Sequence, residues 1–446
     1  METVDTLLHA AWIIPVEPKG AVWPDHSLAI RDGRIVALLP RHEAQARFMA
    51  AAEVHLPRQA LIPGLVNAHT HSAMNLLRGL ADDLPLMTWL GEHIWPTEQR
   101  WVDATFVEAG SRLAVAEMIK GGTTCFNDMY FFPEETARVA AECGVRACIG
   151  MIVLDFPTRY AQHADDYLHK GLALHDAWRD HPLIHTAFAP HAPYSVSDAP
   201  LRQLKVLADE LDVPIHMHVH ETAAEVAEAI TRDGRRPLAR LEALELLGPN
   251  FMAVHMTQLV DAEIALLART GSHVIHCPES NLKLASGFCP VARLLAAGVN
   301  VALGTDGAAS NNDLDLLSEM RIAALLAKGV SGDAAAVPAF QALQMATLNG
   351  ARALGIGDQI GSLRPGKWAD VVAVDLGGLD RQPLYHPLSQ LVYTANRDHV
   401  TDVWVAGRPL LRAGVLTHLD EAALIQSARE WGVRIATTPQ ETSDDE

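Results

Sequence analysis

The chain has 446 residues, of which 49% are hydrophobic and 20% charged, and such a composition is typical of a globular protein with a large core. Its formal net charge of −19 disfavours nucleic acid and anionic membranes as partners, because both are bound by basic surfaces. No apolar run reaches the roughly 18 residues that a membrane-spanning helix needs. The acidic start of the chain lacks the basic region of a signal peptide, so we expect a cytoplasmic protein.

The cysteines are odd in number and scattered, and no two of them form a Cys-x-x-Cys pair. This spacing disfavours both a disulfide framework and a cysteine-rich zinc knuckle. The five positions are Cys125, Cys143, Cys148, Cys277 and Cys289.

Both ends of the chain are expected to be rich in β-structure. Residues 27–39 predict a hairpin, because Asp32-Gly33 lies between two alternating segments and Asp-Gly is a strong hairpin signal. Near the other end, residues 370–375 predict a strand and residues 402–410 a second hairpin. The two ends are therefore expected to form parts of one small domain.

Between the two ends, short apolar strands alternate with segments of helical length. Residues 104–120 and 201–211 show apolar side chains at the three- and four-residue spacing of helices. Eight strands alternating with helices over this length favour a (β/α)8 barrel. The candidate strands are residues 61–67, 123–128, 146–152, 184–190, 214–220, 251–255, 273–276 and 301–305.

Two histidines, His69 and His71, follow the apolar run 60–66. Alternate side chains of a strand share a face, so the two imidazoles are expected to point the same way. Imidazole is the commonest neutral metal ligand, and two on one strand supply half of a tetrahedral zinc site. Among 22 histidines a single such pair often arises by chance, so the case depends on further polar residues downstream.

Further polar side chains stand at the ends of other candidate strands. Active sites of (β/α)8 barrels lie at the carboxyl ends of the strands, which is where these residues are expected to meet. One alone would more often be structural, but several sets together favour a metal site. They are His216, His218, His220 and Glu221 on strand 214–220, His255 on strand 251–255, and Asp306 after strand 301–305.

Three imidazoles and a carboxylate can hold one Zn²⁺ or Fe²⁺ and leave room for water. Spacing alone leaves open which histidine of strand 214–220 joins His69, His71 and Asp306. A metal of this kind lowers the pKa of bound water from 15.7 to about 7. Glu221, three residues after His218, is the natural candidate to carry protons between water and substrate.

Several stretches of the chain carry a resemblance to a known family. On these stretches the chain resembles the amidohydrolase superfamily, and within it is similar to the 5-methylthioadenosine/S-adenosylhomocysteine deaminases of the chlorohydrolase-like group. Together they span nearly the whole chain. They are residues 63–71, 75–80, 189–194, 218–221, 280–286, 304–312 and 361–370.

The resemblance implies a (β/α)8 barrel over residues 61–360. Beside it, residues 1–60 and 361–446 would form a composite β-sandwich domain, with the acidic tail 441–446 solvated. Relatives with two metals bridge them by a lysine at the end of the fourth barrel strand, and strand 184–190 has no lysine, so one metal is expected. A homodimer or homotetramer is also implied.

The resemblance also assigns roles to the polar residues. It makes His69, His71, His218 and Asp306 the ligands of one divalent metal, most simply Zn²⁺, although the same ligands accept Fe²⁺ or Mn²⁺. Glu221 becomes the proton shuttle, and His255 and Asp306 orient the attacking water. His216 and His220 then pack around the site rather than bind the metal.

Substrate contacts follow from the same resemblance. Trp89 would stack on a purine, although a core tryptophan is an equal alternative, and Glu98 would accept hydrogen bonds from ribose hydroxyls. His191 would reach the substrate. Met151 stands where some relatives carry an arginine, and its thioether suits an S-methyl group better than a carboxylate, while Arg159 on the following loop could still bind a carboxylate. This contrast favours methylthioadenosine over S-adenosylhomocysteine.

The implied activity is hydrolytic deamination of the adenine ring of 5′-methylthioadenosine, S-adenosylhomocysteine or adenosine. Metal-bound hydroxide would attack C6, Glu221 would protonate N1, and ammonia would leave. One alternative keeps the metal site and changes the substrate to another aminopurine, a pterin or a triazine. A more remote alternative is a barrel that serves as a non-catalytic scaffold.

Overall fold

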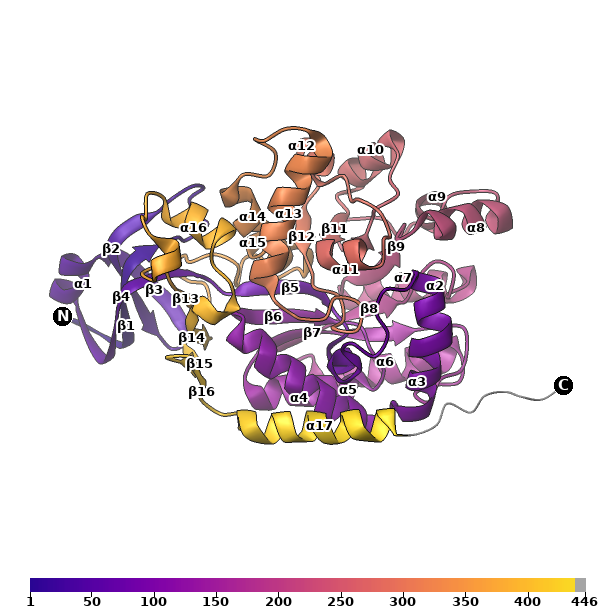
Figure 1. Cartoon of the computed structure of the whole chain (residues 1–446), viewed down its shortest axis with the longest axis horizontal. Helices are drawn as coiled ribbons and strands as arrows, with labels where there is room; N and C mark the ends of the chain where they lie inside the picture. The colour runs from indigo at the N-terminus through magenta and orange to yellow at the C-terminus, as the bar shows by residue number, and fades with distance from the viewer. Residues whose placement is uncertain (438–446) are drawn as a thin grey trace.

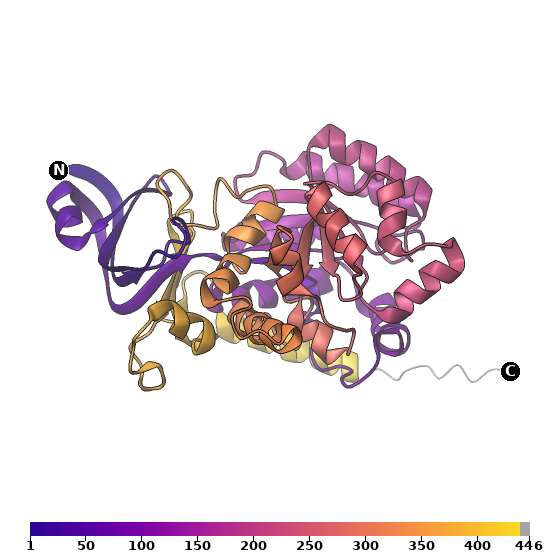
Figure 2. The same ribbon diagram turned by 90° about the horizontal axis from the view of Figure 1, so that it is seen from above.

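A computed structural model describes residues 1–437 of the chain and contains two eight-stranded sheets. One sheet forms a small domain at the N-terminal end of the molecule, and the other lies within a ring of helices (Figures 1 and 2). The acidic tail 441–446, expected to be solvated, lies outside the described residues. Within residues 1–437, no helix combines the length and apolarity that crossing a membrane requires.

Both ends of the chain contribute to the first sheet, as the hairpin signals predicted. Its strand order is β16-β15-β14-β13-β4-β1-β2-β3, so β13 pairs with β4 and joins the two halves. The hairpin predicted at 27–39 is β2 and β3, which pair antiparallel around Asp32-Gly33. The strands are β1 (Glu2–Ile13), β2 (Trp23–Arg31), β3 (Arg34–Pro40), β4 (Phe48–Pro63), β13 (Val371–Asp375), β14 (Val400–Val405), β15 (Arg408–Arg412) and β16 (Val415–Leu416).

The second sheet is the predicted parallel barrel, and the fold class is confirmed. Its strands follow one another in chain order, each parallel to the next. The last strand returns to the first, where the amide of Asp306 donates to the carbonyl of His69 (3.1 Å). The strands are β5 (Leu65–Thr70), β6 (Thr123–Asp128), β7 (Arg146–Val153), β8 (Ile184–Pro190), β9 (Ile215–Val219), β10 (Phe251–His255), β11 (His273–His276) and β12 (Val301–Leu303).

Some of the helices around the barrel begin at side-chain caps. Asp103 accepts a hydrogen bond from the amide of Phe106 at the start of α4, and Thr222 does the same for Glu225 at the start of α8. The helices are α1 (Arg41–Arg47), η1 (Ser72–Leu77), α2 (Leu86–Thr88), η2 (Trp89–Ile94), α3 (Trp95–Trp101), α4 (Ala104–Lys120), α5 (Pro133–Cys143), α6 (Ala164–Trp178), α7 (Asp198–Leu211), α8 (Ala223–Asp233), α9 (Pro237–Ala243), α10 (Asp261–Thr270), α11 (Pro278–Lys283), α12 (Val291–Ala296), α13 (Leu316–Ser331), α14 (Ala339–Met345), α15 (Leu348–Ala353), η3 (Leu379–Arg381), α16 (Pro387–Tyr393), η4 (Arg397–His399) and α17 (Glu421–Ala436).

The junction between the two sheets differs from the prediction. The run 61–67 was expected to form one barrel strand, but it is divided at Gly64 between β4 of the small domain and β5 of the barrel. The amide of Gly64 donates to the carbonyl of Asp370 (2.9 Å), and its Cα lies directly against Thr124. The position expected for the domain boundary, after residue 60, therefore lies inside β4, and the two sheets meet at Gly64 instead.

The last described helix, α17, belongs to neither half of the small domain. It lies along α4 on the outside of the barrel (Figure 1). Its buried Trp431 packs edge-on against Phe106 and Trp101. Residues 361–437 therefore contribute to the small domain and then return to the barrel.

Candidate active site

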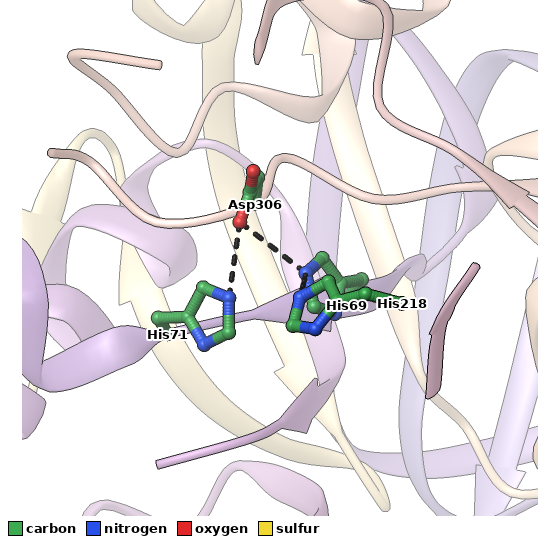
Figure 3. Close-up of side chains that lie close together, drawn as sticks. All are labelled: His69, His71, His218 and Asp306. Atoms are coloured by element: carbon green, nitrogen blue, oxygen red, sulfur yellow. Dashed lines mark hydrogen bonds and ion pairs between the residues drawn. The ribbon is translucent and has the colours of Figure 1, made fainter. Parts of the chain in front are cut away.

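Four side chains converge at the carboxyl ends of the barrel strands (Figure 3). His69 is the second-last residue of β5, His71 directly follows this strand, His218 lies on β9, and Asp306 follows β12. Asp306 Oδ1 lies 3.2 Å from Nε2 of both His69 and His71. His218 Nε2 lies 3.2 Å from His69 Nε2, and one ligand atom from each residue lies within 4.8 Å of the others. We call these four residues the His–Asp cluster.

The hydrogen bonds on the far side of the three imidazoles leave Nε2 of each ring facing the centre. His71 Nδ1 donates to the carbonyl of Met129 (2.5 Å), and His218 Nδ1 donates to the carbonyl of His191 (2.8 Å). His69 Nδ1 lies 2.9 Å from His216 Nε2. A carbonyl can only accept, so Nδ1 of His71 and of His218 carries a proton, and Nε2 is the ring atom that faces the centre. These contacts orient ligands for a metal.

The spacing within the His–Asp cluster fits a single tetrahedral ion. Ligands about 2.0–2.1 Å from zinc lie about 3.3 Å from one another, close to the 3.2 Å separations found here. Burial alone would raise the pKa of Asp306, but hydrogen bonds from His69 and His71 bring it well below its usual range. Asp306 is therefore an anion at neutral pH, and its charge favours a cation between it and the imidazoles.

The burial of the site also keeps two of its imidazoles neutral. Burial lowers the pKa of His69 to about 4 and that of His218 well below the ordinary value. Burial would also lower the pKa of His71, but the hydrogen bond to Asp306 raises it to about 9. Neutral imidazole is the form that binds metal, so desolvation prepares His69 and His218 for that role.

Three further side chains hold the cluster in place. His216 contacts His69, and Asn127 Nδ2 lies 3.1 Å from the other nitrogen of His216. The Ser280 hydroxyl donates to Asp306 Oδ2 (2.7 Å). His216 thus packs behind the cluster. His220, in contrast, points toward α9, where its Nε2 accepts from the amide of Leu238 (3.2 Å).

Strained backbone accompanies the site. His220, His255 and Asp306 have φ angles of 55°, 73° and 64°, in the left-handed region that non-glycine residues rarely adopt. Such conformations cluster at functional sites, where the surrounding fold holds them. Here they turn the chain sharply at the ends of three barrel strands; Asp306 belongs to the His–Asp cluster and His255 lies beside it, whereas the side chain of His220 points away toward α9.

Glu221 and His255 lie beside the His–Asp cluster, 3.8 Å apart between carboxylate and Nε2. Burial raises the pKa of Glu221, which favours its protonated form. Asn281 Oδ1 accepts from His255 Nδ1 (2.9 Å), so Nε2 faces Glu221. The carboxylate of Glu225 accepts hydrogen bonds from the amides of His220 and Glu221 at 3.1 and 2.6 Å and fixes this strand end.

One cavity of about 610 Å³ opens onto these groups. It contains most of the residues that the sequence assigned to substrate contacts. The members that matter below are His71, His218, Glu221, His255 and Asp306 in or beside the His–Asp cluster, the buried or partly buried Trp89, Glu98, Tyr130, His191, Phe131, Phe132 and Leu154, and the exposed Phe156 and Arg159.

Glu98 and Trp89 enter this cavity from the segment after β5. The Tyr130 hydroxyl donates to Glu98 Oε1 (2.7 Å), and burial raises the pKa of Glu98 to about 7. Trp89 opens the single π-helical turn η2, a feature often found at functional sites, and its buried Nε1 has no hydrogen-bond partner.

His191 and Arg159 complete the expected contacts. His191 lies beside His218, and burial lowers its pKa to about 3, so it is neutral. The guanidinium of Arg159 donates to the carbonyl of Arg100 (2.9 Å) and lies 3.8 Å from Asp103. Its side chain is 43% exposed, so Arg159 stands at the mouth of the cavity.

The expected contact between Met151 and a substrate is wrong. Met151 does not line the cavity; its side chain packs against Gly171 of α6 on the outside of the barrel. Side chains alternate along a strand, so Cys148 and Ile152 of β7 face inward while Met151 faces the helices. The preference for methylthioadenosine that was argued from Met151 therefore loses its basis.

Some functional neighbours were not singled out from the sequence. Tyr130 follows β6 and reaches Glu98, and its position just after a barrel strand was the available signal. Ser280 and Asn281 lie in the first turn of α11 and contact Asp306 and His255, respectively. Their stretch carried the resemblance, but no role was assigned to either. Glu225 had no signal beyond its position four residues after Glu221.

Comparison with known proteins agrees with this geometry. Residues 60–410 match the model of the amidohydrolase family. The chain belongs to the amidohydrolase family. This confirms the resemblance drawn from the sequence, and with the His–Asp cluster it makes the chain a metal-dependent hydrolase.

Amidohydrolase relatives match almost the whole chain. A 5-methylthioadenosine/S-adenosylhomocysteine deaminase from Teredinibacter turnerae is 52% identical, over 96% of this chain and 97% of its own. A zinc-bound adenosine deaminase from Xanthomonas campestris is 55% identical, with a TM-score of 0.97 over 98% of this chain and 100% of its own. Together with the His–Asp cluster, this zinc-bound relative supports a divalent metal in this chain.

More distant amidohydrolases share the architecture. The atrazine chlorohydrolase of Arthrobacter aurescens superposes with a TM-score of 0.89 at 22% identity, over 96% of this chain and 99% of its own. A guanine deaminase from Escherichia coli superposes with a TM-score of 0.82, also at 22% identity, over 91% and 99%. At this identity the likeness establishes the fold alone.

Proposed function

We propose that this amidohydrolase deaminates the adenine ring of 5′-substituted adenosines, with 5′-methylthioadenosine as the preferred substrate and S-adenosylhomocysteine or adenosine as alternatives. The observation that carries the proposal is that one cavity is lined by the His–Asp cluster, by Glu221 and by Glu98. The names of the relatives that are 52% and 55% identical support the same substrate class.

The metal would be a single Zn²⁺ held by His69, His71, His218 and Asp306. When bound, a zinc ion acts as a Lewis acid and lowers the pKa of coordinated water to about 7. The zinc-bound relative supports this choice over Fe²⁺ or Mn²⁺, and β8, which has no lysine to bridge a second metal, supports a single ion.

The residues around the His–Asp cluster would transfer protons, orient the water and contact the substrate. The reaction forms a C6–O bond from water, breaks the C6–N6 bond and releases ammonia, leaving the inosine analogue. Glu221, with its raised pKa, holds a proton that it can deliver to N1 of the purine. His255 and Asp306 orient the water; Asp306 takes up one of its protons and passes it to N6, so that ammonia leaves, and the remaining hydroxyl proton returns to Glu221. His191 contacts the ring from the opposite side.

The far side of the cavity would select the nucleoside. Glu98, held by Tyr130, accepts hydrogen bonds from the ribose hydroxyls, and Trp89 packs on the purine face. The apolar side chains toward the outside, among them Phe131 and Phe156, suit an S-methyl group. Arg159 at the mouth would meet the carboxylate of a longer substituent such as that of S-adenosylhomocysteine.

Ammonia release by the zinc-loaded protein tests the proposal. The panel is methylthioadenosine, S-adenosylhomocysteine, adenosine, adenine and guanine. We expect Glu221→Gln to lower kcat by roughly 10²–10⁴-fold, the usual contribution of general acid–base catalysis. Glu210→Gln, which removes an exposed carboxylate from α7, is the matched control and should leave kcat unchanged.

A second variant tests the nucleoside specificity. Glu98→Gln is expected to raise KM for nucleosides and to leave any turnover of free bases unaffected. Activity confined to free bases or triazines would move the chain to another branch of the family. A folded, zinc-loaded protein without any activity on the panel would instead favour the scaffold alternative.

We also place this enzyme in the cytoplasm. All five cysteines are unpaired and buried, as is usual for proteins of reducing compartments. A homo-oligomer remains a prediction from the resemblance.

A further inference from the structure

A second group of metal-binding side chains lies on the small domain, away from the barrel. It consists of His9 on β1 and Glu53 and His55 on β4. The two strands pair in parallel, with His9 directly opposite His55, and Glu53 lies two residues before His55 on the same face. One ligand atom from each residue lies within 4.8 Å of the other two. We call this group the sheet cluster.

His9 is the fixed member of the sheet cluster. Its side chain is fully buried, and its Nδ1 lies 2.6 Å from the hydroxyl of Ser27 on β2. Its Nε2 is buried without any hydrogen-bond partner and points toward Glu53, whose carboxylate lies 3.4 Å away. When Nδ1 donates to Ser27, the Nε2 lone pair is directed into the sheet cluster. A buried nitrogen without a partner is unusual and calls for an occupant.

The other two members are exposed and free to turn toward an ion. The side chain of His55 is 62% exposed and that of Glu53 is 47% exposed, and His55 Nε2 lies 3.7 Å from the Glu53 carboxylate. The His9 and His55 rings stack at 4.9 Å, so a rotation of the exposed ring suffices to bring its nitrogen onto a shared ion.

The charges around the sheet cluster permit a cation. Arg41 is the nearby cationic side chain, and its guanidinium lies 2.8 Å from Asp25, which compensates its charge. Glu53 supplies the negative charge that offsets a dication.

We propose that His9, Glu53 and His55 form a second divalent-metal site that binds Zn²⁺ and ties β1 to β4. Two imidazoles and a carboxylate are a common zinc donor set, and the exposed side of the cluster leaves positions for water. The site is built from strands of the small domain, so it is independent of the His–Asp cluster and of the deaminase activity.

The test is a calorimetric titration of Zn²⁺ into the enzyme whose active site already holds its metal. Metal analysis of the dialysed protein counts the bound ions independently. We expect each chain to bind a second equivalent of Zn²⁺. His55→Ala and Glu53→Gln, both at exposed positions, should weaken this second equivalent at least tenfold without changing kcat. His9→Gln is not the main test, because replacing a fully buried ring is expected to destabilise the small domain.

A matched control is available on the neighbouring helix. His42 of α1 is also exposed and lies 3.9 Å from a glutamate, Glu43, but it belongs to neither cluster. His42→Ala should keep the second equivalent. Either a single equivalent in the parent enzyme, or a second equivalent that His55→Ala and Glu53→Gln leave unchanged, would overturn the proposal.

Cu²⁺ provides a readout of the ligands themselves. Electron paramagnetic resonance is recorded on Cu²⁺ added to the enzyme with a filled active site. The Cu²⁺ signal should show hyperfine coupling to two imidazole nitrogens in the parent and to one in His55→Ala. Coupling to a single nitrogen in the parent protein would show that His9 does not participate and would contradict the site as drawn.

Discussion

Glu98 shows how a single side chain can favour binding at the expense of stability. Its carboxyl group faces the active-site cavity, and burial raises its pKa to about 7. In the unfolded chain the same group titrates near 4.5. Between these two values the folded protein holds a proton that the unfolded chain has lost, so the free energy of unfolding falls as pH rises.

Glu98→Gln should therefore stabilise the protein, and more so at higher pH. We expect a free energy of unfolding about 1–3 kcal/mol above that of the parent at pH 8, because the amide carries no charge to desolvate. The advantage should shrink toward pH 5. Denaturant unfolding across this pH range measures it, with Glu92→Gln, at an exposed position of η2, as the control. A difference that is independent of pH would contradict this account.

The residues of the candidate site were predictable to different degrees. His69, His71, His218 and Asp306 stand at strand ends within recognisable stretches, so the fold brings them together once the strands are placed. Tyr130 could not be assigned in this way. Its role depends on Glu98 reaching it from α3, and such a contact between two segments is not encoded in the spacing of either.

At the level of elements, most barrel strands were predictable because short apolar runs alternate with helical periodicity. Met151 was placed wrongly even though its strand was placed correctly. The in–out alternation of β7 decides which side chains reach the cavity, and it is visible only once Cys148 and Ile152 are known to face inward. The division of the run 61–67 between two strands could not be predicted, for a different reason. Two strands of different sheets follow each other with a single residue, Gly64, between them.

Gly64→Ala should be strongly destabilising because this junction has no room for a side chain. A Cβ there would come within 1.9 Å of the Thr124 hydroxyl oxygen, so β4, β5 or β6 would have to shift. We expect a loss of about 1–3 kcal/mol in the free energy of unfolding, the usual effect of overpacking. Thermal unfolding provides the measurement.

Gly248→Ala is the matched control for this junction. A Cβ at Gly248 would have no neighbour within 4 Å, and its backbone is not left-handed. This variant should unfold within about 0.5 kcal/mol of the parent, as surface substitutions usually do. Equal stability of the two alanine variants would show that the junction can relax around a methyl group.

At the scale of the whole molecule, a buried ion pair joins the small domain to the barrel. Arg146 begins β7, and Asp370 immediately precedes β13. Arg146 donates to both carboxylate oxygens of Asp370, at 3.1 and 3.3 Å, and each side chain is only 1% exposed. Asp370 also accepts from the amide of Ala406 (2.8 Å), so one carboxylate contacts both units.

Asp370→Asn should lower the free energy of unfolding by about 3–5 kcal/mol, because it leaves the guanidinium of Arg146 buried without a counter-charge. Replacing both partners by apolar residues, as in Arg146→Met with Asp370→Leu, should cost less than the single change, since no uncompensated charge remains. Urea unfolding of the single and double variants measures the difference.

The exposed pair Arg269–Glu242 provides the comparison, with side chains 66% and 48% exposed. Glu242→Gln should change stability by no more than about 1 kcal/mol, because water screens this pair. Since Arg146 lies at the amino end of its strand, opposite the active-site end of the barrel, folded Asp370→Asn should keep the parent kcat. A loss of kcat without a loss of stability would instead mean that the union of the two sheets, rather than the barrel alone, shapes the active site.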